Sequence, residues 1–468
     1  MKKHISVSII SSFLIFLFFV IETTSSQVLK DASAGWKAGV ARVVITPDQH
    51  MWIAGYSARN HPADGIIHDL WAKAIALEDM KGNKALLITT DLESFPKYLS
   101  DRIRNRITDT YGFTRAQIIL NSSHTHSGPV IQGMYNIYTD DPKELEKIRS
   151  YSVTLEEKIV TLVGEAIKSM VPVQLYAQNG ITRFQVNRRN NNEATLNTLT
   201  ELHGPNDFAV PVLKVTDASG NLIAVAFGYA CHNTTLMGYQ WCGDYAGFAQ
   251  IELEKLHPGV TAMFFQGAGA DQNPLPRGSV FLAQQYGRSL AAATDRVLNE
   301  EMRKLTPVIT SEYSEIDLDL DDPMSKEKLS EIVEKTSDYQ KQWAENLLSK
   351  IERGEPIRTS YPYPVQIWKL GDQPIISLGG ELVIDYAIEF KRIFGQDIFV
   401  MGYSNDVMAY IPSAAILKEG GYEGMSSQIA FGLPAVWKSN IETVIIGEVL
   451  RLARKAGIPE IGSQDVTR

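Results

Sequence analysis

The segment 121–129 reads Asn-Ser-Ser-His-Thr-His-Ser-Gly-Pro and follows an apolar run that ends at Leu120. A strand that ends in a polar turn closed by Gly and Pro presents its side chains at the rim of a sheet, where solvent and substrate reach them. His124 and His126 are separated by one residue, so on extended backbone one ring can bind a metal ion while the other acts as acid or base. The pattern indicates a metal site, but two solvated or backbone-bonded histidines explain this segment equally well.

A hydrolytic zinc site needs about three protein ligands and an open position for water. His232 also stands just past an apolar run, so it could meet His124 at one end of a sheet. Among the acidic residues, Glu381 is the best placed to join them, because it follows the apolar run 373–378. From its own sequence context, however, Glu381 is better interpreted as a glutamate at a helix start, where the helix dipole favours negative charge.

The chain has two cysteines, Cys231 and Cys242, which flank His232 in one short segment. In an oxidising compartment they could form a disulfide that closes a loop beside the site, and two buried thiols are equally allowed.

The composition is that of an ordinary globular protein. Of 468 residues, 44% are hydrophobic and 21% are charged, which gives ample material for a core. The formal net charge is -9 and there is no basic cluster, so the chain is a poor candidate for binding nucleic acid. We find no internal repeat and no clear domain boundary, and we expect residues 27–468 to form a single large catalytic domain.

Residues 1–26 are typical of an export signal peptide. Lys2 and Lys3 supply the positive start, residues 5–21 the apolar stretch and residues 23–26 the small residues suited to cleavage. The alternative is a retained membrane anchor, which the length of the apolar stretch only marginally permits. We therefore expect an exported protein, periplasmic or secreted, whose mature chain begins near Gln27.

Strand-like apolar runs alternate with helical patterns along most of the chain, which predicts an α/β fold: a mixed sheet with flanking helices and a metal site on loops at strand ends. Strands are expected at 35–47, 70–90 with a turn at 81–83, 173–177, 209–230 with a turn at 218–221, 261–265, 363–369, 373–378 and 397–401. Helices are expected at 96–111, 142–169, 246–256, 280–303, from about 382 to 394, and 436–455. Residues 183–203 and 410–424 are expected as loops, and the charged helical run 322–355 as a solvated insertion or a cap over the sheet.

Five motifs occur together in one order: His-Thr-His-Ser-Gly-Pro at 124–129, Val-Asn-Arg at 186–188, the His232 loop, Gly-Glu at 380–381, and two tyrosines twelve residues apart at 410 and 422. With these motifs the chain resembles the catalytic domain of the neutral/alkaline, non-lysosomal ceramidases, from about residue 35 through the last predicted helix. Each motif is modest by itself, whereas five in the right order are fairly specific.

The resemblance implies one zinc ion per chain, with four ligands: His124, His232, Glu381 and Tyr410. It also implies three residues close to the scissile amide: His126, Arg188 and Tyr422. In these roles zinc activates the attacking water and polarises the carbonyl, His126 moves the proton to the leaving amine, and Arg188 and Tyr422 donate to the developing oxyanion.

The sequence departs from the family pattern in two places. Where the family carries a serine in a Gly-Asp-x-Ser-Pro-Asn type loop, segment 267–274 places Gln272. An amide donates and accepts hydrogen bonds but is not a nucleophile, so attack by metal-bound water survives the change while the substrate's identity is put in doubt. The family also usually continues into a C-terminal immunoglobulin-like domain, and the resemblance here is to the catalytic domain alone.

These inferences predict an exported zinc amidohydrolase that acts on ceramide or another N-acyl compound. One alternative is a metal hydrolase of the same architecture with a non-sphingolipid substrate, such as an ester, lactone or glycan-derived molecule, which a polar pocket would favour. Another is a non-catalytic, metal-containing binding protein, against which the presence of His126, Arg188 and Tyr422 argues. The expected partners are a small-molecule or lipid substrate and transient contact with a membrane surface, without nucleic acid or an obligate protein partner.

Overall fold

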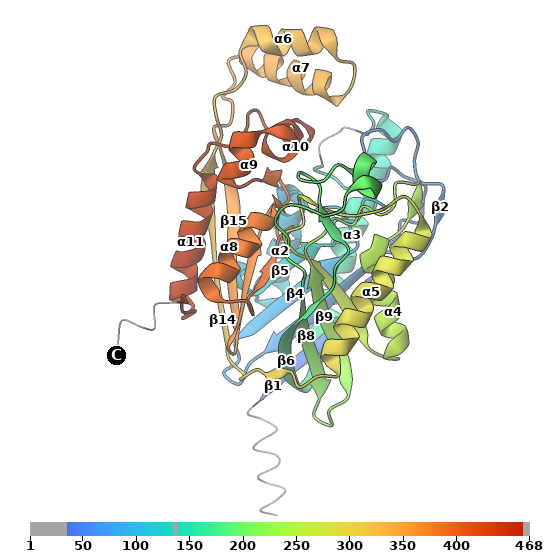
Figure 1. Ribbon diagram of the computed structural model, residues 1–468, viewed down its shortest axis with the longest axis vertical. Coiled ribbons are helices and arrows are strands. Elements are labelled where there is room, and N and C mark those ends of the chain that lie inside the picture. Colours follow the sequence, from blue (N-terminus) through green and yellow to red (C-terminus); the bar gives the residue numbers. More distant parts are fainter. Residues whose placement is uncertain (1–34, 135–137, 462–468) are drawn as a thin grey trace, which may run out of the picture.

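The computed structural model describes residues 35–134 and 138–461, so the expected export signal at 1–26 lies outside the described residues. Two β-sheets packed face to face form the centre of the molecule, and helices cover both outer faces (Figure 1). The prediction of a mixed α/β fold in a single large domain is confirmed.

The larger sheet has nine strands and is mixed. In spatial order it contains β11 (Thr261–Gln266), β9 (Leu222–Tyr229), β8 (Ala209–Asp217), β6 (Val171–Ile181), β1 (Trp36–Val44), β3 (Trp71–Glu78), β4 (Lys84–Thr90) and β5 (Ile118–Ser122), with β13 (Arg303–Lys304) paired to β6. The pairs β4–β5 and β9–β11 are parallel, and the other neighbours are antiparallel.

The smaller sheet has four strands in the order β14 (Ile309–Asp319), β15 (Ser360–Leu370), β16 (Gln373–Leu378) and β18 (Phe399–Met401). It packs on the larger sheet through side chains that alternate along each strand. Ile75 and Leu77 of β3 join Trp368 of β15 in the core between the sheets, whereas Ala74 and Ala76 face the opposite way. This period of two allows each strand to serve two cores.

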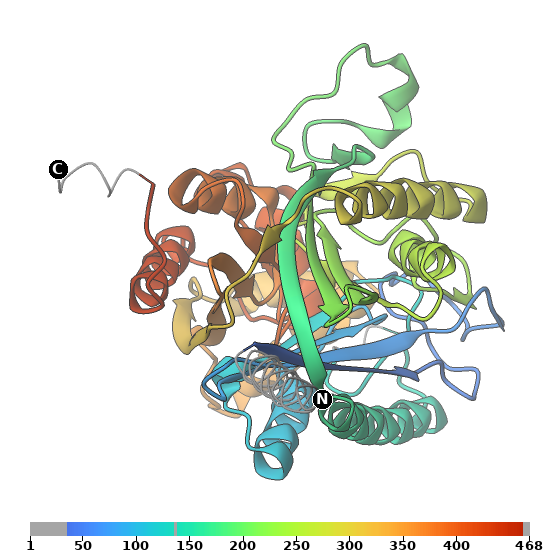
Figure 2. The same ribbon diagram turned by 90° about the horizontal axis from the view of Figure 1, so that it is seen from below.

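Helices cover the two outer faces of this sandwich. The larger sheet is covered by α2 (Lys97–Tyr111), α3 (Pro142–Lys168), α4 (Asp244–Leu256) and α5 (Val280–Leu298), and the smaller sheet by α8 (Ile384–Phe394) and α11 (Ile441–Lys455). Seen from below, the strands lie between the C-terminal helices on one side and α3, α4 and α5 on the other (Figure 2). Each helix buries the apolar stripe that predicted it, for example Ile441, Ile445 and Val449 in α11.

Short elements complete the chain. They are β2 (Gly65–Ile66), η1 (Arg115–Gln117), β7 (Gln185–Asn187), η2 (Glu193–Thr198), β10 (Gln240–Trp241), β12 (Gln272–Pro274), β17 (Glu381–Leu382), β19 (Tyr410–Ile411), α9 (Ala414–Glu419), α10 (Gly421–Gly424) and η3 (Ser426–Phe431). The prediction of a loop at 410–424 is therefore wrong: Ser413 accepts the Ile416 N–H at 3.3 Å and starts α9. The segment 183–203 likewise contains β7 and η2. Two helix boundaries also differ, since α5 ends at Leu298 before β13, and α11 begins at Ile441.

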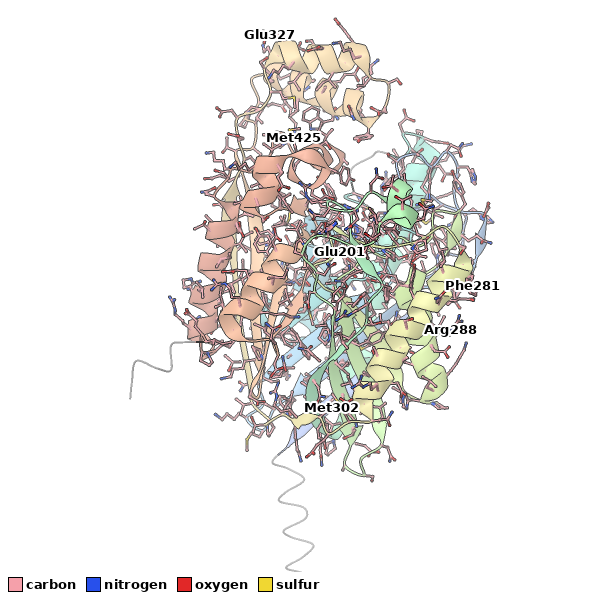
Figure 3. All side chains as sticks on the ribbon, in the orientation of Figure 1. Glu201, Phe281, Arg288, Met302, Glu327 and Met425 are labelled. Carbon is pink, nitrogen blue, oxygen red and sulfur yellow. The ribbon has the colours of Figure 1, made fainter. Side chains whose placement is uncertain are left out.

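The charged run 322–355 forms two helices, α6 (Lys326–Lys335) and α7 (Tyr339–Glu352), inserted between β14 and β15. They have a small core of their own around Leu329, Trp343 and Leu347. Figure 3 shows Glu327 of α6 at the outer end of this insertion, beyond Met425 and α10. Of the helices that the structure describes, none is both long and apolar enough to cross a membrane.

The sequence left open whether Cys231 and Cys242 form a disulfide. Both are free, buried thiols.

Candidate metal centre and active-site cavity

Strand ends bring the site residues together. The parallel strands β4 and β5 lead to Glu93 and His124, and β9, parallel to β11, leads to His232. Because parallel strands send their carboxyl ends to the same edge, polar residues that follow them gather there. The second half of the chain adds Glu381 and Tyr410, which pair with each other across the parallel strands β17 and β19.

The centre of the site is one carboxylate oxygen between two imidazoles. Oε2 of Glu381 lies 3.2 Å from Nε2 of His124 and 3.1 Å from Nε2 of His232. The hydroxyl of Tyr410 lies 3.3 Å from the same nitrogen of His232. All four side chains are buried.

The outer nitrogen of each imidazole is bonded to the backbone. Nδ1 of His124 lies 2.9 Å from the carbonyl oxygen of Glu93, and Nδ1 of His232 lies 2.8 Å from that of Gly269. A proton on Nδ1 satisfies each carbonyl and leaves a lone pair on Nε2. Two such lone pairs then face Oε2 of Glu381, which has no hydrogen-bond partner in the part of the chain that the structure describes. A proton on His124 or a bound cation can bridge these three atoms, and the set of two imidazoles and a carboxylate fits a metal ion such as zinc.

The ionisable groups of the cluster shift one another's pKa values strongly, and without a metal ion a proton on His124 offsets part of the negative charge of Glu381. Burial opposes protonation of His124, but the carboxylates of Glu381 and Glu93 outweigh it and raise the pKa of His124. Burial and the positive charge of Arg188 lower the pKa of His232 to about 4. Burial would raise the pKa of Glu381, yet the two histidines hold it well below its usual range. A negative charge is thus fixed at the point where the ligands meet.

His126 stands next to this cluster without being tied to the backbone. Its Nε2 lies 3.1 Å from Nε2 of His124, and its buried Nδ1 has no hydrogen-bond partner among the described residues. Its ring packs edge-on against Tyr56 and lies over Gly55, where a Cβ atom would come within 2.4 Å of the ring. Burial and the neighbouring His124 and His232 hold the pKa of His126 well below its usual value. His126 is therefore neutral, with a lone pair on one of its ring nitrogens.

Arg188 connects the cluster to the C-terminal helices. Its Nη2 donates to the hydroxyl of Tyr410 at 3.1 Å, and its Nε donates to Glu423 at 2.7 Å. The guanidinium lies over the rings of Tyr410 and Tyr422, 5.7 and 5.6 Å from their centroids. Burial raises the pKa of Tyr422 to about 12, so its hydroxyl is a donor at neutral pH. Glu423 also binds Arg189 and fixes the whole group.

Gln272 adjoins the site through its backbone. Its carbonyl oxygen accepts the N–H of His232 at 2.9 Å, and it begins β12, paired with β7. Its side-chain amide is buried and donates to the carbonyl of Pro205 at 3.3 Å, while its Oε1 has no hydrogen-bond partner among residues 35–134 and 138–461. Gln272 is thus placed beside a predicted metal ligand, where it orients the His232 loop.

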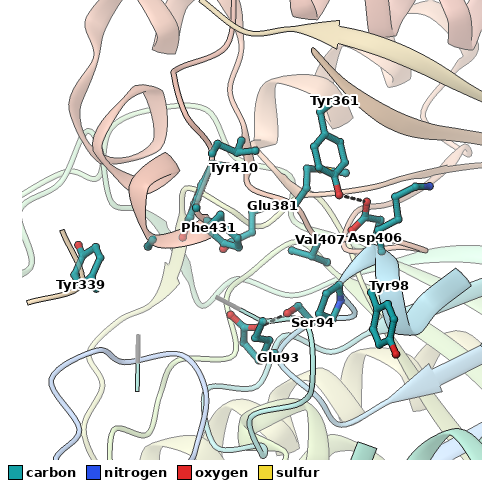
Figure 4. A pocket seen from close by; sticks show the side chains of 18 of the residues that line it. Glu93, Ser94, Tyr98, Tyr339, Tyr361, Glu381, Asp406, Val407, Tyr410 and Phe431 are labelled. Carbon is teal, nitrogen blue, oxygen red and sulfur yellow. Dashed lines mark hydrogen bonds between the residues drawn. The ribbon is translucent and has the colours of Figure 1, made fainter. Parts of the chain in front are cut away.

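A cavity of about 500 Å³ opens beside the cluster. Figure 4 shows Glu93, Glu381, Tyr410 and Asp406 around it. Tyr339 of α7 lies farther from the cluster, at the outer part of the cavity, so the inserted helices contribute to its wall.

The structure brings the eight predicted site residues into one region: His124, His126, Arg188, His232, Gln272, Glu381, Tyr410 and Tyr422. Sequence reasoning missed Glu93, Tyr403 and Glu423. The Tyr403 ring lies 4.5 Å from that of His124, centroid to centroid, with backbone φ of 50°. Glu93 follows a strand as His124 does, so its position past β4 was a usable signal. Glu423 had no such signal, since its role depends on Arg188 across the fold.

The chain matches the family model described as neutral/alkaline non-lysosomal ceramidase, N-terminal, over residues 36–275. This region contains His124, His126, Arg188, His232 and Gln272. The remaining predicted site residues lie beyond it: Glu381, Tyr410 and Tyr422.

Curated relatives and a solved structure give similar results. The chain is 25% identical to neutral ceramidase B of Dictyostelium discoideum over 279 residues, covering 56% of this chain and 38% of that protein. It is 24% identical to a neutral ceramidase of Drosophila melanogaster over 235 residues, covering 48% and 32%. The chain thus matches less than two fifths of the length of these relatives. The crystal structure of the neutral ceramidase from Pseudomonas aeruginosa matches with a TM-score of 0.71 at 17% identity, over 91% of this chain and 75% of that one. This last likeness establishes a shared fold that includes most of the second half of the chain.

Proposed function

Because this chain belongs to the neutral/alkaline non-lysosomal ceramidase family, we propose that it is an exported, zinc-dependent hydrolase that cleaves the amide bond of ceramide or a related N-acyl compound. The observation that carries the proposal is the convergence of Nε2 of His124 and Nε2 of His232 on one oxygen of Glu381, at 3.2 and 3.1 Å. Tyr410 completes a set of four ligands.

A bound zinc ion supplies Lewis acidity toward the scissile carbonyl and the attacking water. The protein holds its ligands in place through the backbone carbonyls of Glu93 and Gly269. His126, neutral and adjacent to the cluster, accepts the proton of the attacking water at Nε2 and returns it to the leaving nitrogen. A C–O bond forms, the C–N bond breaks, and one water is consumed to give a carboxylate and an amine.

Arg188 and Tyr422 donate hydrogen bonds to the developing oxyanion. The Arg188 side chain is held by Glu423 on one side and by Tyr410 on the other, so its positive charge does not need to reorganise during the reaction. The Tyr422 hydroxyl is protonated and about half of the side chain is exposed, at the boundary between cluster and cavity. None of these steps requires a serine at position 272.

One observation favours a second candidate, a hydrolase of the same mechanism with a polar substrate. The cavity wall carries six ionisable groups besides histidine and tyrosine: Glu93, Lys97, Lys350, Arg358, Glu381 and Asp406. An alkyl chain against the inner wall would keep water from the buried carboxylate of Glu93. On this second proposal the substrate is an N-acyl compound outside the sphingolipids.

The test is hydrolysis of a fluorescent short-chain ceramide by the purified protein, as isolated, after chelation, and after zinc is restored. Zinc-dependent release of the amine, absent in Glu381→Ala and retained in the surface control Glu331→Gln, supports the amidase proposal. If the protein binds zinc at the site but leaves ceramide intact, the proposal of a metal site stands and the proposal of a ceramide substrate is wrong. N-acyl compounds with polar amines are then the substrates to assay.

A further inference from the structure

The cavity wall mixes hydrogen-bond acceptors, donors and aromatic rings. Its aromatic members are Tyr98, Tyr138, Tyr339, Tyr361, Tyr410, Tyr422 and Phe431. A volume of about 500 Å³ is in the range of pockets that hold a compact, drug-sized molecule, roughly 300–1,000 Å³. The two long chains of a natural lipid would have to lie outside it.

Glu93 is an acceptor on the cavity wall beside the cluster. One carboxylate oxygen accepts a hydrogen bond from the neighbouring hydroxyl of Ser94, and no Lys or Arg lies within 4.0 Å of it among the described residues. Glu93, His124 and Glu381 each place a ligand atom within 4.8 Å of the others. A carboxylate so placed meets the part of a substrate that adjoins the scissile amide, and it has lone pairs left for a donor there.

The donors lie on the part of the wall that comes from the inserted segment. Lys350 of α7 and Arg358, which precedes β15, are exposed at the cavity and form no ion pair among the described residues. Arg358 lies over the ring of Tyr361, 4.8 Å from its centroid. By contrast, Lys97 is already paired with Asp101 and Glu315.

The groups on the cavity wall favour one class of substrate. A substrate with a carboxylate next to the scissile amide would be repelled by Glu93. An alkyl chain beside Glu93 would keep water from this buried carboxylate, and it would offer no acceptor to Lys350 or Arg358. Hydroxyl groups both donate and accept, and so match both ends of the cavity, while the C–H faces of a ring can pack on the tyrosines.

We infer that the substrate is an N-acylated, polyhydroxylated amine of the amino-sugar class, and that Glu93 recognises it by accepting a hydrogen bond from a hydroxyl group next to the scissile amide. The inference rests on the proposed amidase function and specifies the substrate class of the second candidate, the hydrolase with a polar substrate. The reaction is the same hydrolysis, giving an acyl carboxylate and a free amino sugar.

The experiment compares two substrates with the same fluorescent hexanoyl group, one on the amine of glucosamine and one on sphingosine in mixed micelles. We expect kcat/KM of the zinc-loaded protein to be at least tenfold higher for the glucosamine derivative. Glu93→Gln keeps the size and the contact with Ser94 but loses the charge, and should lower that kcat/KM by about 10- to 100-fold, the usual range for a hydrogen bond to a charged group. Zinc content is measured for each variant, and Glu331→Gln is the matched control on the surface.

A preference for the sphingosine derivative overturns the inference. So does a Glu93→Gln variant with full zinc that loses activity equally on both substrates, since that result assigns Glu93 to the chemistry and not to recognition. If neither amide is cleaved, the amidase function fails and the inference is decided by binding. Calorimetry with free glucosamine should then show binding to the zinc-loaded protein that Glu93→Gln weakens by at least tenfold, and equal or absent binding by both proteins overturns it.

Discussion

Arg188 is held by one acidic residue, which makes Glu423 a positioning residue for the site. Its carboxylate accepts from Arg188 at 2.7 Å and from Arg189 at 2.7 Å. Without the charge, the Arg188 guanidinium is free to turn away from Tyr410. We expect Glu423→Gln to lower kcat by about 10- to 100-fold, as is usual for residues that orient a ligand or catalytic group, with zinc content and KM nearly unchanged.

Glu419 provides a matched control for this change. It binds Arg189 at 2.7 Å but does not contact Arg188, and 63% of its side chain is exposed. Glu419→Gln should therefore leave kcat within about twofold of the unmodified protein, because exposed ion pairs contribute little. Equal loss of activity in both variants would show that Glu423 acts only by holding the helices together.

The ionisation of Asp406 should make the stability of the fold depend on pH. Burial raises its pKa to about 7, although Tyr361 donates to its carboxylate at 2.8 Å. The folded state thus binds a proton that the unfolded chain releases near its ordinary pKa of about 4. Stability from this group is fully present below about pH 4 and is lost as pH rises to about 7, because ionised Asp406 is disfavoured in the fold.

We therefore expect Asp406→Asn to gain stability relative to the unmodified protein as pH rises from 4 to 8. The full gain is at most about 4 kcal/mol, since one pKa unit corresponds to about 1.4 kcal/mol. Urea unfolding at several pH values measures the difference. A difference that stays constant over this range would mean that Asp406 is ionised in the folded protein.

At the scale of residues, the sequence identified those side chains whose neighbours along the chain carry the signal. His124 and His126 were predictable because they are separated by one residue and follow a strand-like run. The residues around Glu381, by contrast, favoured a glutamate that only stabilises the start of a helix. The structure places Glu381 in the short strand β17, three residues before α8, with its Oε2 3.2 Å from Nε2 of His124. Glu93 and Glu423 were not identified, because the function of an acidic residue depends on which group lies across from it.

At the scale of elements, long periodic segments were predictable and short or irregular ones were not. The strands β3, β4, β8 and β9 were foreseen from apolar runs bounded by turns. The strand β14 was not, since only Ile309 and Leu318 of its eleven residues are buried. Its pairing with β15, which no local pattern encodes, makes it a strand.

The inserted helices α6 and α7 form a unit whose two ends lie next to each other in the fold. Leu320 N–H donates to the carbonyl of Thr359 at 2.8 Å, so the ends of the insertion already face each other as in a hairpin. We expect a variant with residues 321–358 replaced by Asn-Gly to fold, because that pair favours the two-residue turn that joins antiparallel strands. It should bind zinc normally while KM rises about tenfold or more, since Tyr339, Lys350 and Arg358 no longer line the cavity.

Circular dichroism and zinc content serve as the controls for this deletion. The Trp343 indole N–H donates to the carbonyl of Leu433, so some loss of stability is expected on that face. An unchanged KM in a folded variant would show that substrate does not reach this part of the wall.

At the scale of the whole molecule, the predicted ligands come from both halves of the chain. His124 and His232 follow strands of the nine-stranded sheet, whereas Glu381 and Tyr410 belong to the part that packs with the smaller sheet. A metal ion at their meeting point links the two layers, and it binds the folded chain only, since the unfolded chain does not hold these residues together.

Zinc should therefore stabilise the fold, and the increment should depend on Glu381. At a free concentration a thousandfold above the dissociation constant, binding adds about 4 kcal/mol to the free energy of unfolding, or roughly 4–5 °C in Tm for a chain of this length. Calorimetry with and without chelator measures this increment. The Glu381→Ala variant changes the metal-free Tm as well, because it removes a buried charge between two histidines, so only the zinc-dependent difference is compared. If zinc raised the Tm of this variant as much as that of the unmodified protein, zinc would bind at another site. The contacts of His124 and His232 with Glu381 would then not mark a zinc site.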